Sequence, residues 1–313
     1  MNPTLTVIVP VFNRAHIVRD TLDSIARQRV APDCLIVVDN NSTDASAETV
    51  KQWISEYSGP MRCEFASEPK PGSAAARNRG LALADTELVS FFDSDDKVRP
   101  DYAESIKEAF SSDPQLDLVY WAVKHHPIAG RPRRLRFSSR GDIAFQIFHS
   151  FLATQRFAVK RDFFIRVEGW DESVFVWNDW ELGIRMLLHH PRMRSIPRVL
   201  ADTYAQADSI TGPSFFSRRE KIEWALGRAE ADIRRYASAD RLHLLSLLDL
   251  RRAILAGLYR REGNEAAGRR LLAEAVESAR LLPGGERLAR LCRTAASLTS
   301  LGMRGADRLS LLV

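Results

Sequence analysis

Short apolar runs alternate with amphipathic stretches over the first hundred residues of the chain. Runs typical of buried strands occupy four segments, namely residues 5–12, 34–39, 61–68 and 88–92. Between them, segments 17–28 and 46–58 carry apolar residues at helical spacing, and small residues over 72–84 predict a third helix. Strands that alternate with helices imply right-handed crossovers, so the pattern predicts a largely parallel, doubly wound sheet.

The pattern loosens after residue 100 and is almost entirely helical after residue 213. Between these points we expect a helix over 102–112 and a strand over 116–123. Residues 250–283 resemble one tetratricopeptide unit, but only one copy is visible and an independent solenoid needs about three or more. We therefore predict an α/β domain over residues 1–213 and an all-α accessory domain over residues 214–313.

The net charge of +5 is unevenly distributed along the chain. Residues 214–313 carry 19 Arg and Lys against 12 Asp and Glu, which leaves a net charge of −2 on the rest. Such a surplus is typical of a solvated, arginine-rich helical surface, or of a surface that contacts an anionic partner such as the inner membrane leaflet. We expect no nucleic-acid partner.

Cysteine content and apolar run length indicate the compartment. Three widely spaced cysteines fit neither a disulfide framework nor a zinc cluster, which favours a reducing environment. The N-terminus lacks a basic segment followed by a long apolar one, and no apolar run approaches the ~18 residues of a membrane span. We expect a cytoplasmic protein. The basic C-terminal region also suggests peripheral contact with the inner face of the membrane.

Three carboxylates follow the strand predicted at 88–92: Asp93, Asp95 and Asp96. Carboxylates this close repel one another unless a positive charge lies between them. A divalent cation such as Mg²⁺ or Mn²⁺, held by one or two carboxylates, supplies that charge and keeps open positions for substrate phosphates. The alternative is an acidic turn that caps the next helix or solubilises a loop.

Two more candidates lie near the same edge of the predicted sheet, where ligands of doubly wound folds bind. Asp39 ends strand 34–39 and can accept from a ribose hydroxyl or the imide N–H of uracil, although an Asx turn explains it equally well. Arg77, on the small-residue helix, can pair with phosphate. The turn PVFNR contains no glycine, so the dinucleotide-binding fingerprint is missing and a nicotinamide or flavin cofactor is not expected.

Six motifs occur together in this chain: TVIVPVFNR, LIVVDNNSTD, PGSAAARNRG, FFDSDD, GWDE and NDWELGIR. In this order and approximate spacing, over residues 4 to about 212, they resemble the inverting family 2 glycosyltransferases of the GT-A fold. The resemblance implies an α/β fold with a Rossmann-like, mostly parallel sheet flanked by helices, followed here by an all-α region. It also implies a nucleotide-diphosphate-sugar donor, with a UDP-sugar favoured, a divalent metal and an activated acceptor hydroxyl.

The resemblance also assigns roles to individual positions. Nucleotide binding is expected of Pro10, Phe12, Asn13 and Arg14 around the nucleobase, Asp39 at uracil or ribose, Arg77 near the nucleotide, and Asp93 at the ribose or a metal-bound water. Asp95 is expected to ligate the Mn²⁺ or Mg²⁺ that bridges the two phosphates. Asp179 is expected to be the general base, although the family has Glu-Asp at this motif and this chain has Asn178 before the aspartate.

Four residues near the candidate base are predicted to contact the sugar or the acceptor: Trp170, Asp171, Glu172 and Trp180. Indole faces suit sugars, but indoles are equally often core residues. The family often has a histidine near the end of the catalytic domain, where this chain has Gln206, which argues for weaker metal binding. His125 and His126 are predicted to lie elsewhere. The arginine-rich segment 131–140 is either a surface loop, a cover for the diphosphate, or a receptor for an acidic or lipid-phosphate acceptor.

These parts suit one chemistry. A sugar that leaves a nucleoside diphosphate develops charge that a metal stabilises, while the acceptor hydroxyl loses its proton to a base. We predict an inverting glycosyltransferase of the hexosyltransferase type, acting on a saccharide or lipid-linked saccharide in the synthesis of a surface polysaccharide or glycoconjugate. The alternatives are a catalytically decayed domain that serves as a scaffold, and a sugar-nucleotidyltransferase, whose glycine-rich N-terminal loop is missing here.

Overall fold

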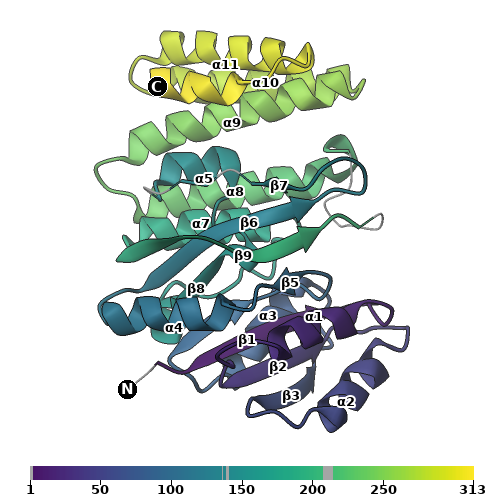
Figure 1. The fold of residues 1–313 in the computed structure, drawn as a ribbon. Helices are drawn as coiled ribbons and strands as arrows, with labels where there is room; N and C mark the ends of the chain where they lie inside the picture. The colour runs from purple at the N-terminus through teal and green to yellow at the C-terminus, as the bar shows by residue number, and fades with distance from the viewer. Residues whose placement is uncertain (1–2, 136, 139–140, 207–213) are drawn as a thin grey trace.

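The computed structural model describes residues 3–135, 137–138, 141–206 and 214–313, and its centre is a nine-stranded sheet (Figure 1). The strands are β1 (Leu5–Val11), β2 (Cys34–Asp39), β3 (Arg62–Ser67), β4 (Leu88–Phe91), β5 (Lys97–Val98), β6 (Leu118–His126), β7 (Arg133–Arg134), β8 (Phe157–Lys160) and β9 (Met193–Tyr204). Their order is β3-β2-β1-β4-β8-β6-β9-β5, and β7 pairs with β6.

Helices flank the sheet and follow it. The α-helices are α1 (Val18–Ala26), α2 (Ser46–Glu56), α3 (Ser73–Leu83), α4 (Tyr102–Ser112), α5 (Ile143–His149), α6 (Arg161–Arg166), α7 (Asn178–Leu188), α8 (Arg219–Tyr236), α9 (Arg241–Arg261), α10 (Glu265–Arg280) and α11 (Gly285–Ser300). Short 3₁₀ turns are η1 (Thr154–Arg156), η2 (Phe216–Arg218) and η3 (Ala306–Leu312). The predicted α/β fold followed by an all-α region is therefore confirmed.

The first four strands form the parallel, doubly wound part that the apolar pattern predicts. β1 pairs in parallel with both β2 and β4, and β2 pairs in parallel with β3. Because successive side chains of a strand point to opposite faces, Val9 packs in the core under α1, α2 and α4, while Ile8 packs under α3, α6 and α7. Both faces are covered, which explains why these strands read as continuous apolar runs.

The second half of the sheet is mixed rather than parallel. β8 is antiparallel to β4 and to β6, whereas β6 and β9 run parallel over a long ladder with two register shifts. β5 joins the far edge by pairing antiparallel with β9. This arrangement brings the end of β9 back beside the acidic turn that follows β4.

The C-terminal helices pack on the α/β part through a shared apolar core. One cluster contains Trp180 and Ile184 of α7 together with Ile222 of α8 and Leu248 of α9, and Figure 1 shows α9–α11 stacked above α5, α7 and α8. The division at residue 213, like the tetratricopeptide resemblance of the antiparallel pair α9 and α10, stays a prediction. No helix in the described part of the chain is both long and apolar enough to cross a bilayer.

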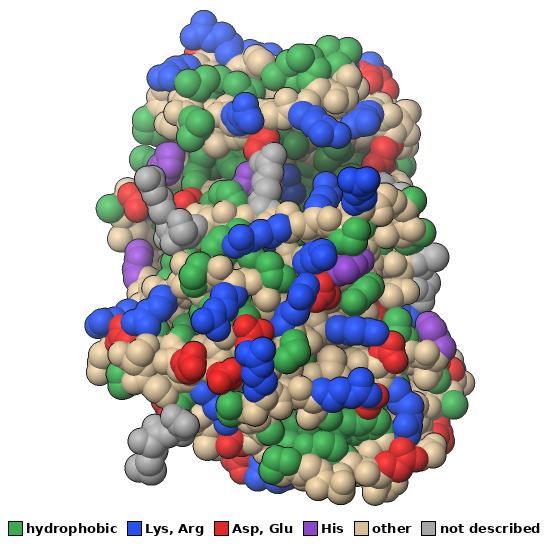
Figure 2. Space-filling view, in the orientation of Figure 1, with side chains coloured by type: hydrophobic (Ala, Val, Ile, Leu, Met, Phe, Trp, Pro, Cys, Tyr) green, Lys and Arg blue, Asp and Glu red, His purple; other side chains and the backbone are tan. Residues whose placement is uncertain are grey.

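Surface charge is not confined to the C-terminal helices. Figure 2 shows Lys and Arg side chains over the helices at the top of this face and also over the sheet below them. Basic side chains are therefore present on this face of the α/β part as well, although residues 1–213 carry a net charge of −2.

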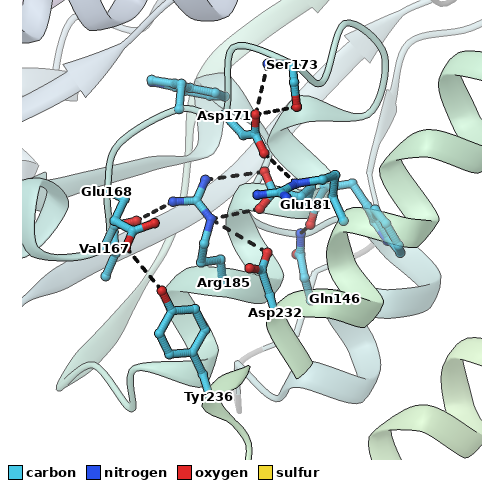
Figure 3. Close-up of polar contacts among 12 residues, drawn as sticks. Gln146, Val167, Glu168, Asp171, Ser173, Glu181, Arg185, Asp232 and Tyr236 are labelled. Atoms are coloured by element: carbon cyan, nitrogen blue, oxygen red, sulfur yellow. Dashed lines mark hydrogen bonds and ion pairs between the residues drawn. The ribbon is translucent and has the colours of Figure 1, made fainter. Parts of the chain in front are cut away.

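A buried ion-pair network fixes α7 against α8 (Figure 3). Arg185 Nε lies 2.8 Å from Glu181 Oε1 and 3.8 Å from Asp232 Oδ2 of α8, and its Nη1 donates to the carbonyl of Val167. Burial and the neighbouring Glu181 raise the pKa of Asp232, because two carboxylates share one guanidinium there. The network holds α7, whose first turn contains Asp179.

We predict that Arg185→Met lowers the free energy of unfolding by about 3–5 kcal/mol, because it leaves a buried carboxylate without its partner. The control is Arg27→Met, which removes an exposed i,i+4 pair with Asp23 and should cost less than about 0.5 kcal/mol. Urea unfolding followed by circular dichroism measures both. Equal losses in the two variants would contradict the network's role.

Candidate active site

Three strand ends converge at one edge of the sheet. β1 lies between β2 and β4, Asp39 is in register with Val11, and Phe92 N donates to Ile8 O at 2.9 Å. The loops after these strands therefore meet: residues 12–15 after β1, 40–45 after β2 and 92–96 after β4. The predicted convergence of Asp39 with the acidic turn at this edge follows from the strand order.

The loop after β1 is held by the loop after β2. Asn13 N donates to Ser42 Oγ at 3.0 Å, Asn13 Oδ1 accepts from Thr43 N at 2.8 Å, and Arg14 N donates to Ser46 Oγ at 2.7 Å. Asn13 has a φ of 52°, a left-handed conformation that asparagine tolerates better than most residues. These bonds fix the loop as a rim next to Asp39.

Two residues of the predicted nucleobase set differ in exposure. Phe12 is 53% exposed, so its ring is accessible to a flat ligand. Pro10 is buried within β1, opposite Val38, and has no surface to offer. That Pro10 borders a nucleobase therefore stays a prediction, and its burial within β1 gives it no direct support.

Asp39 carries a polar atom that needs a partner. The side chain is 8% exposed; Oδ2 accepts from Ser42 N at 3.3 Å, and Oδ1 is buried without a hydrogen bond. A buried carboxylate oxygen of this kind is costly unless a donor reaches it. Asn40, which sequence reasoning missed, fixes the neighbouring backbone by donating to Glu68 O and Lys70 O, both at 2.8 Å.

The three carboxylates of the acidic turn differ in whether their partners lie inside the protein. Asp96 is internal, because it accepts from Tyr204 N at 2.8 Å and Gln155 Nε2 at 2.6 Å. Asp95 lies 3.4 Å from Arg14 Nε, and burial together with the charge of Asp93 raises its pKa. Gln155 also donates to Asp93 at 2.5 Å, a link between η1 and the turn after β4 that no sequence motif signals.

These carboxylates fit a hard divalent cation bound by few protein ligands. Asp95 and Asp93 are partly accessible, and the raised pKa of Asp95 reflects a need for positive charge that Arg14 meets only in part. In the described ranges of the chain, no three or more His, Cys, Asp or Glu side chains are arranged around a common ion position. The donor set matches ions that keep most positions for water and phosphate.

Arg77 connects the acidic turn to the start of α7. Its side chain is buried, its Nη2 lies 2.7 Å from Asp93 Oδ1, and its guanidinium stacks 4.4 Å from the centre of the Trp170 ring. Arg77 Nη1 also contacts Ser73 Oγ at 3.3 Å, and the same oxygen accepts from Asn178 Nδ2 at 3.2 Å. Asn178, which replaces the glutamate of the family motif, thus links α7 to α3 through this hydrogen bond.

Asp179 lies in the first turn of α7, where these charges act on it. Burial raises its pKa, the Arg77 charge opposes that rise, and the Asp93 charge adds to it. Its Oδ1 accepts from Trp180 N at 2.8 Å. The charge of Asp93 also raises the pKa of Asp95. Arg77 and Asp93, which pair with each other, therefore both act on Asp179, while Asp95 pairs with Arg14.

A cavity of about 530 Å³ opens beside Asp179. Trp177, Arg156 and Arg251 line it, and Asp95 does not. Neither Arg156 nor Arg251 carried a signal in the sequence, since one lies in η1 and the other in α9.

The residues predicted to contact sugar or acceptor prove to have internal partners. Trp170 is 2% exposed and packs on Phe91, and Trp180 is 2% exposed with its Nε1 donating to Ile147 O at 2.9 Å. The prediction of Trp170 as a sugar platform is wrong, because Arg77 covers its accessible face. Trp180 is likewise a core residue, although it borders the cavity beside Asp179.

Asp171 and Glu172 tie loops together instead of facing the cavity. Asp171 Oδ2 lies 2.8 Å from Arg228 Nε of α8 (Figure 3). Glu172 accepts from Asn78 Nδ2 at 2.8 Å and from Lys70 Nζ at 2.5 Å. Both therefore have the structural role that a loop end requires.

His126 lies closer to the acidic turn than predicted. Parallel pairing of β6 and β9 sets it opposite Tyr204, on whose ring it stacks at 4.6 Å, while its Nε2 is 2.7 Å from Asp202. Tyr204 N in turn donates to Asp96. The prediction that the histidine pair lies away from the segment ending at Gln206 is therefore wrong for His126.

Segment 131–140 lies only partly within the described residues. Arg136, Ser139 and Arg140 are outside them. Arg133 and Arg134 form β7 and line the cavity beside Asp179.

Comparison with known proteins agrees with this geometry. Residues 6–167 match the family described as Glycosyl transferase family 2. Glycosyltransferase GlyA of Streptococcus pneumoniae is 40% identical over 102 residues, which cover 33% of this chain and 14% of that protein. The match thus spans only a small part of that relative's length.

Solved structures share the fold over the whole chain. Residues 1–349 of TarS from S. aureus, in complex with UDP-GlcNAc, superpose with a TM-score of 0.73 at 16% identity, covering 99% of this chain and 92% of that one. The mannosyltransferase PcManGT from Pyrobaculum calidifontis, in complex with GDP-Man and Mn²⁺, gives a TM-score of 0.57 at 22% identity, covering 100% and 87%.

We predict that Arg77→Met raises the pKa of Asp179 further, because the removed guanidinium favours the ionised carboxylate. Arg77→Lys keeps the positive charge and should leave the pKa of Asp179 closer to its wild-type value. Carbon-detected NMR titration of ¹³C-aspartate-labelled protein measures it, and Asp179→Asn assigns the signal. An unchanged pKa in Arg77→Met would show that Arg77 does not act on Asp179.

Proposed function

The chain belongs to glycosyl transferase family 2, and from that premise we propose an inverting, metal-assisted transferase that uses Asp179 as general base. As a glycosyltransferase it joins a sugar to an acceptor; the donor, the metal and the base are our proposal. The observation that carries the proposal is the position of Arg77, which pairs with Asp93 at 2.7 Å while its charge acts on Asp179.

The donor nucleotide binds across the ends of β1 and β2. Asp39 Oδ1, buried without a partner, accepts from the nucleobase or the ribose, and exposed Phe12 lies on the neighbouring rim. A uracil imide N–H suits the free carboxylate oxygen, so a UDP-sugar is favoured. A UDP-sugar complex of TarS, which has the same fold, supports this choice.

Asp95 holds a Mn²⁺ or Mg²⁺ ion, with Asp93 beside it. When bound, such an ion stabilises the negative charge that the departing diphosphate develops. Arg14 and Arg77 pair with these carboxylates in the protein alone, so both place positive charge beside the proposed diphosphate site. The Mn²⁺ in the PcManGT complex supports a metal in this fold.

Asp179 takes the proton of the acceptor hydroxyl. The oxygen of that hydroxyl attacks the anomeric carbon, the bond from this carbon to the phosphate oxygen breaks, and the electron pair leaves with the nucleoside diphosphate. Burial raises the pKa of Asp179, which brings the base closer to the working pH. A single displacement inverts the anomeric centre, so an α-linked donor gives a β-linked product.

Other features of the sequence-based prediction stay predictions. These are the saccharide or lipid-linked acceptor, the surface polysaccharide or glycoconjugate as product, the cytoplasmic location and the contact with an anionic membrane.

We expect Asp179→Asn to reduce the transfer rate by about 10²–10⁴-fold, because the amide cannot accept the hydroxyl proton. Donor affinity should stay at the wild-type value. Nucleotide release measures turnover, and titration calorimetry measures donor binding. The control is Asp162→Asn, another aspartate in the first turn of a helix, which is exposed on α6. Wild-type turnover in Asp179→Asn would remove this residue from the role of base.

Thermal shift with UDP, GDP and dTDP, each with and without Mn²⁺, tests the donor and metal sites. We predict stabilisation by one nucleotide only when Mn²⁺ is present, since a ligand that binds the folded state alone raises its stability. Asp95→Ala should lose the Mn²⁺-dependent part, whereas Asp240→Ala, an exposed aspartate before α9, should keep it. Equal shifts with and without Mn²⁺ would argue against metal at Asp95.

A further inference from the structure

The cavity beside Asp179 is strongly basic. Among the residues that the structure describes, four guanidinium groups line it, and Asp179 is the only carboxylate. The four are Arg133, Arg134, Arg156 and Arg251. A fifth basic side chain of the lining, His149, is already paired with Asp307 at 3.2 Å.

These arginines come from separate elements, so they are not a solvated run on one surface. Arg133 and Arg134 lie exposed on β7, Arg156 ends η1 and is 3% exposed, and Arg251 reaches the cavity from α9. The β6–β7 ladder holds Arg133 opposite His125 and Arg134 opposite Lys124. The fold therefore builds the basic lining at both the rim and the interior of the cavity.

Holding these charges together is unfavourable without an anion. Burial and the charge of Arg134 together lower the pKa of Arg156 to about 10, while the charge of Asp179 opposes both effects. Burial also lowers the pKa of Arg251 to about 10, and its guanidinium lies 4.8 Å from the centre of the Trp177 ring. An anionic group that enters the cavity would relieve the repulsion and supply charge-assisted hydrogen bonds.

The position of the cavity decides which substrate the anion belongs to. In the proposed function the diphosphate lies at Asp95 and Asp93, and Asp95 does not line this cavity. Asp179 does, and its partner in the reaction is the acceptor hydroxyl. A group bound by the four arginines therefore lies on the acceptor side of the base.

We propose that the acceptor is anionic and carries a phosphate or carboxylate group close to its reacting hydroxyl, which the arginines of this cavity bind. This inference rests on the proposed function for the identity of the acceptor side. Guanidinium forks bind either group in a bidentate manner, so the shared chemistry is a negatively charged oxygen pair. The arginines select the acceptor and orient its hydroxyl towards Asp179.

Binding of simple probes tests the inference on the full chain saturated with UDP and Mn²⁺. The probes are glycerol 1-phosphate against glycerol, and glucuronate against its methyl ester, titrated by ligand-observed NMR. We expect each anion to bind about tenfold or more tightly than its neutral twin, as charged hydrogen bonds imply. Binding should weaken with added salt. Which anion binds better distinguishes a phosphate-bearing from a carboxylate-bearing acceptor.

Two variants and a matched control place the binding in this cavity. Arg133→Gln combined with Arg134→Gln, and separately Arg251→Gln, should each weaken the anion by about tenfold. Arg131→Gln removes an exposed arginine two positions from β7 that does not line the cavity, and it should bind the anion as wild type does. UDP affinity should be the same in all of them. The double variant changes exposed side chains only, so folding is preserved.

Three results would overturn the inference. Anions that bind no better than their neutral twins would do so, as would anion binding that the cavity variants leave unchanged. The third is a parallel loss of UDP affinity in the cavity variants, which would assign the arginines to the donor diphosphate. Hydrolysis of the donor by water, measured as nucleotide release without acceptor, reports separately on the proposed function. The absence of any release would count against the proposed function and not against the anionic acceptor.

Discussion

The site depends on one ion pair, between the buried Arg77 and the partly accessible Asp93. A guanidinium that is 4% exposed is unfavourable in a protein interior unless a carboxylate meets it, and Asp93 does so at 2.7 Å while Trp170 supports the other side of the group. The small residues of α3 let this arginine lie against the sheet. At Gly80 the helix packs so closely on β1 that a Cβ atom would overlap with Ile8 Cγ2. Because Arg77 also acts on Asp179, one side chain sets both the donor edge and the proposed base.

The helical region is part of this arrangement rather than an appendage. Its apolar core is continuous with that of α7, the Arg185 network joins α7 to α8, and Arg251 of α9 reaches into the cavity beside Asp179. A scaffold role for a decayed domain would not require these carboxylates and arginines to stay aligned. A nucleotidyltransferase would not require a carboxylate at the start of α7. The arrangement of charges favours transfer of a sugar to an acceptor that approaches from the helical side.

The first half of the fold could be predicted from the sequence, because each buried strand is an apolar run and each crossover is an amphipathic helix. The edge where Asp39 meets the acidic turn followed from strand order alone. The second half could not, since the antiparallel placement of β8 and the pairing of His126 with Tyr204 depend on contacts between distant segments. Trp170 shows the same limit at the site: its motif suggests a sugar platform, but the aromatic neighbours that bury it are remote in sequence. Gln155, Arg156 and Arg251 belong to no motif, and only the fold brings them together.

A crystal structure with an unreactive nucleotide-sugar analogue and Mn²⁺ tests the central claim most directly. The account predicts that the diphosphate and the ion lie at Asp95 and Asp93, and that Arg77 stays between this group and α7. It also predicts that the anomeric carbon faces Asp179 across a space large enough for one hydroxyl. An analogue whose sugar points away from Asp179, or whose diphosphate lies among the arginines of the cavity, would contradict it.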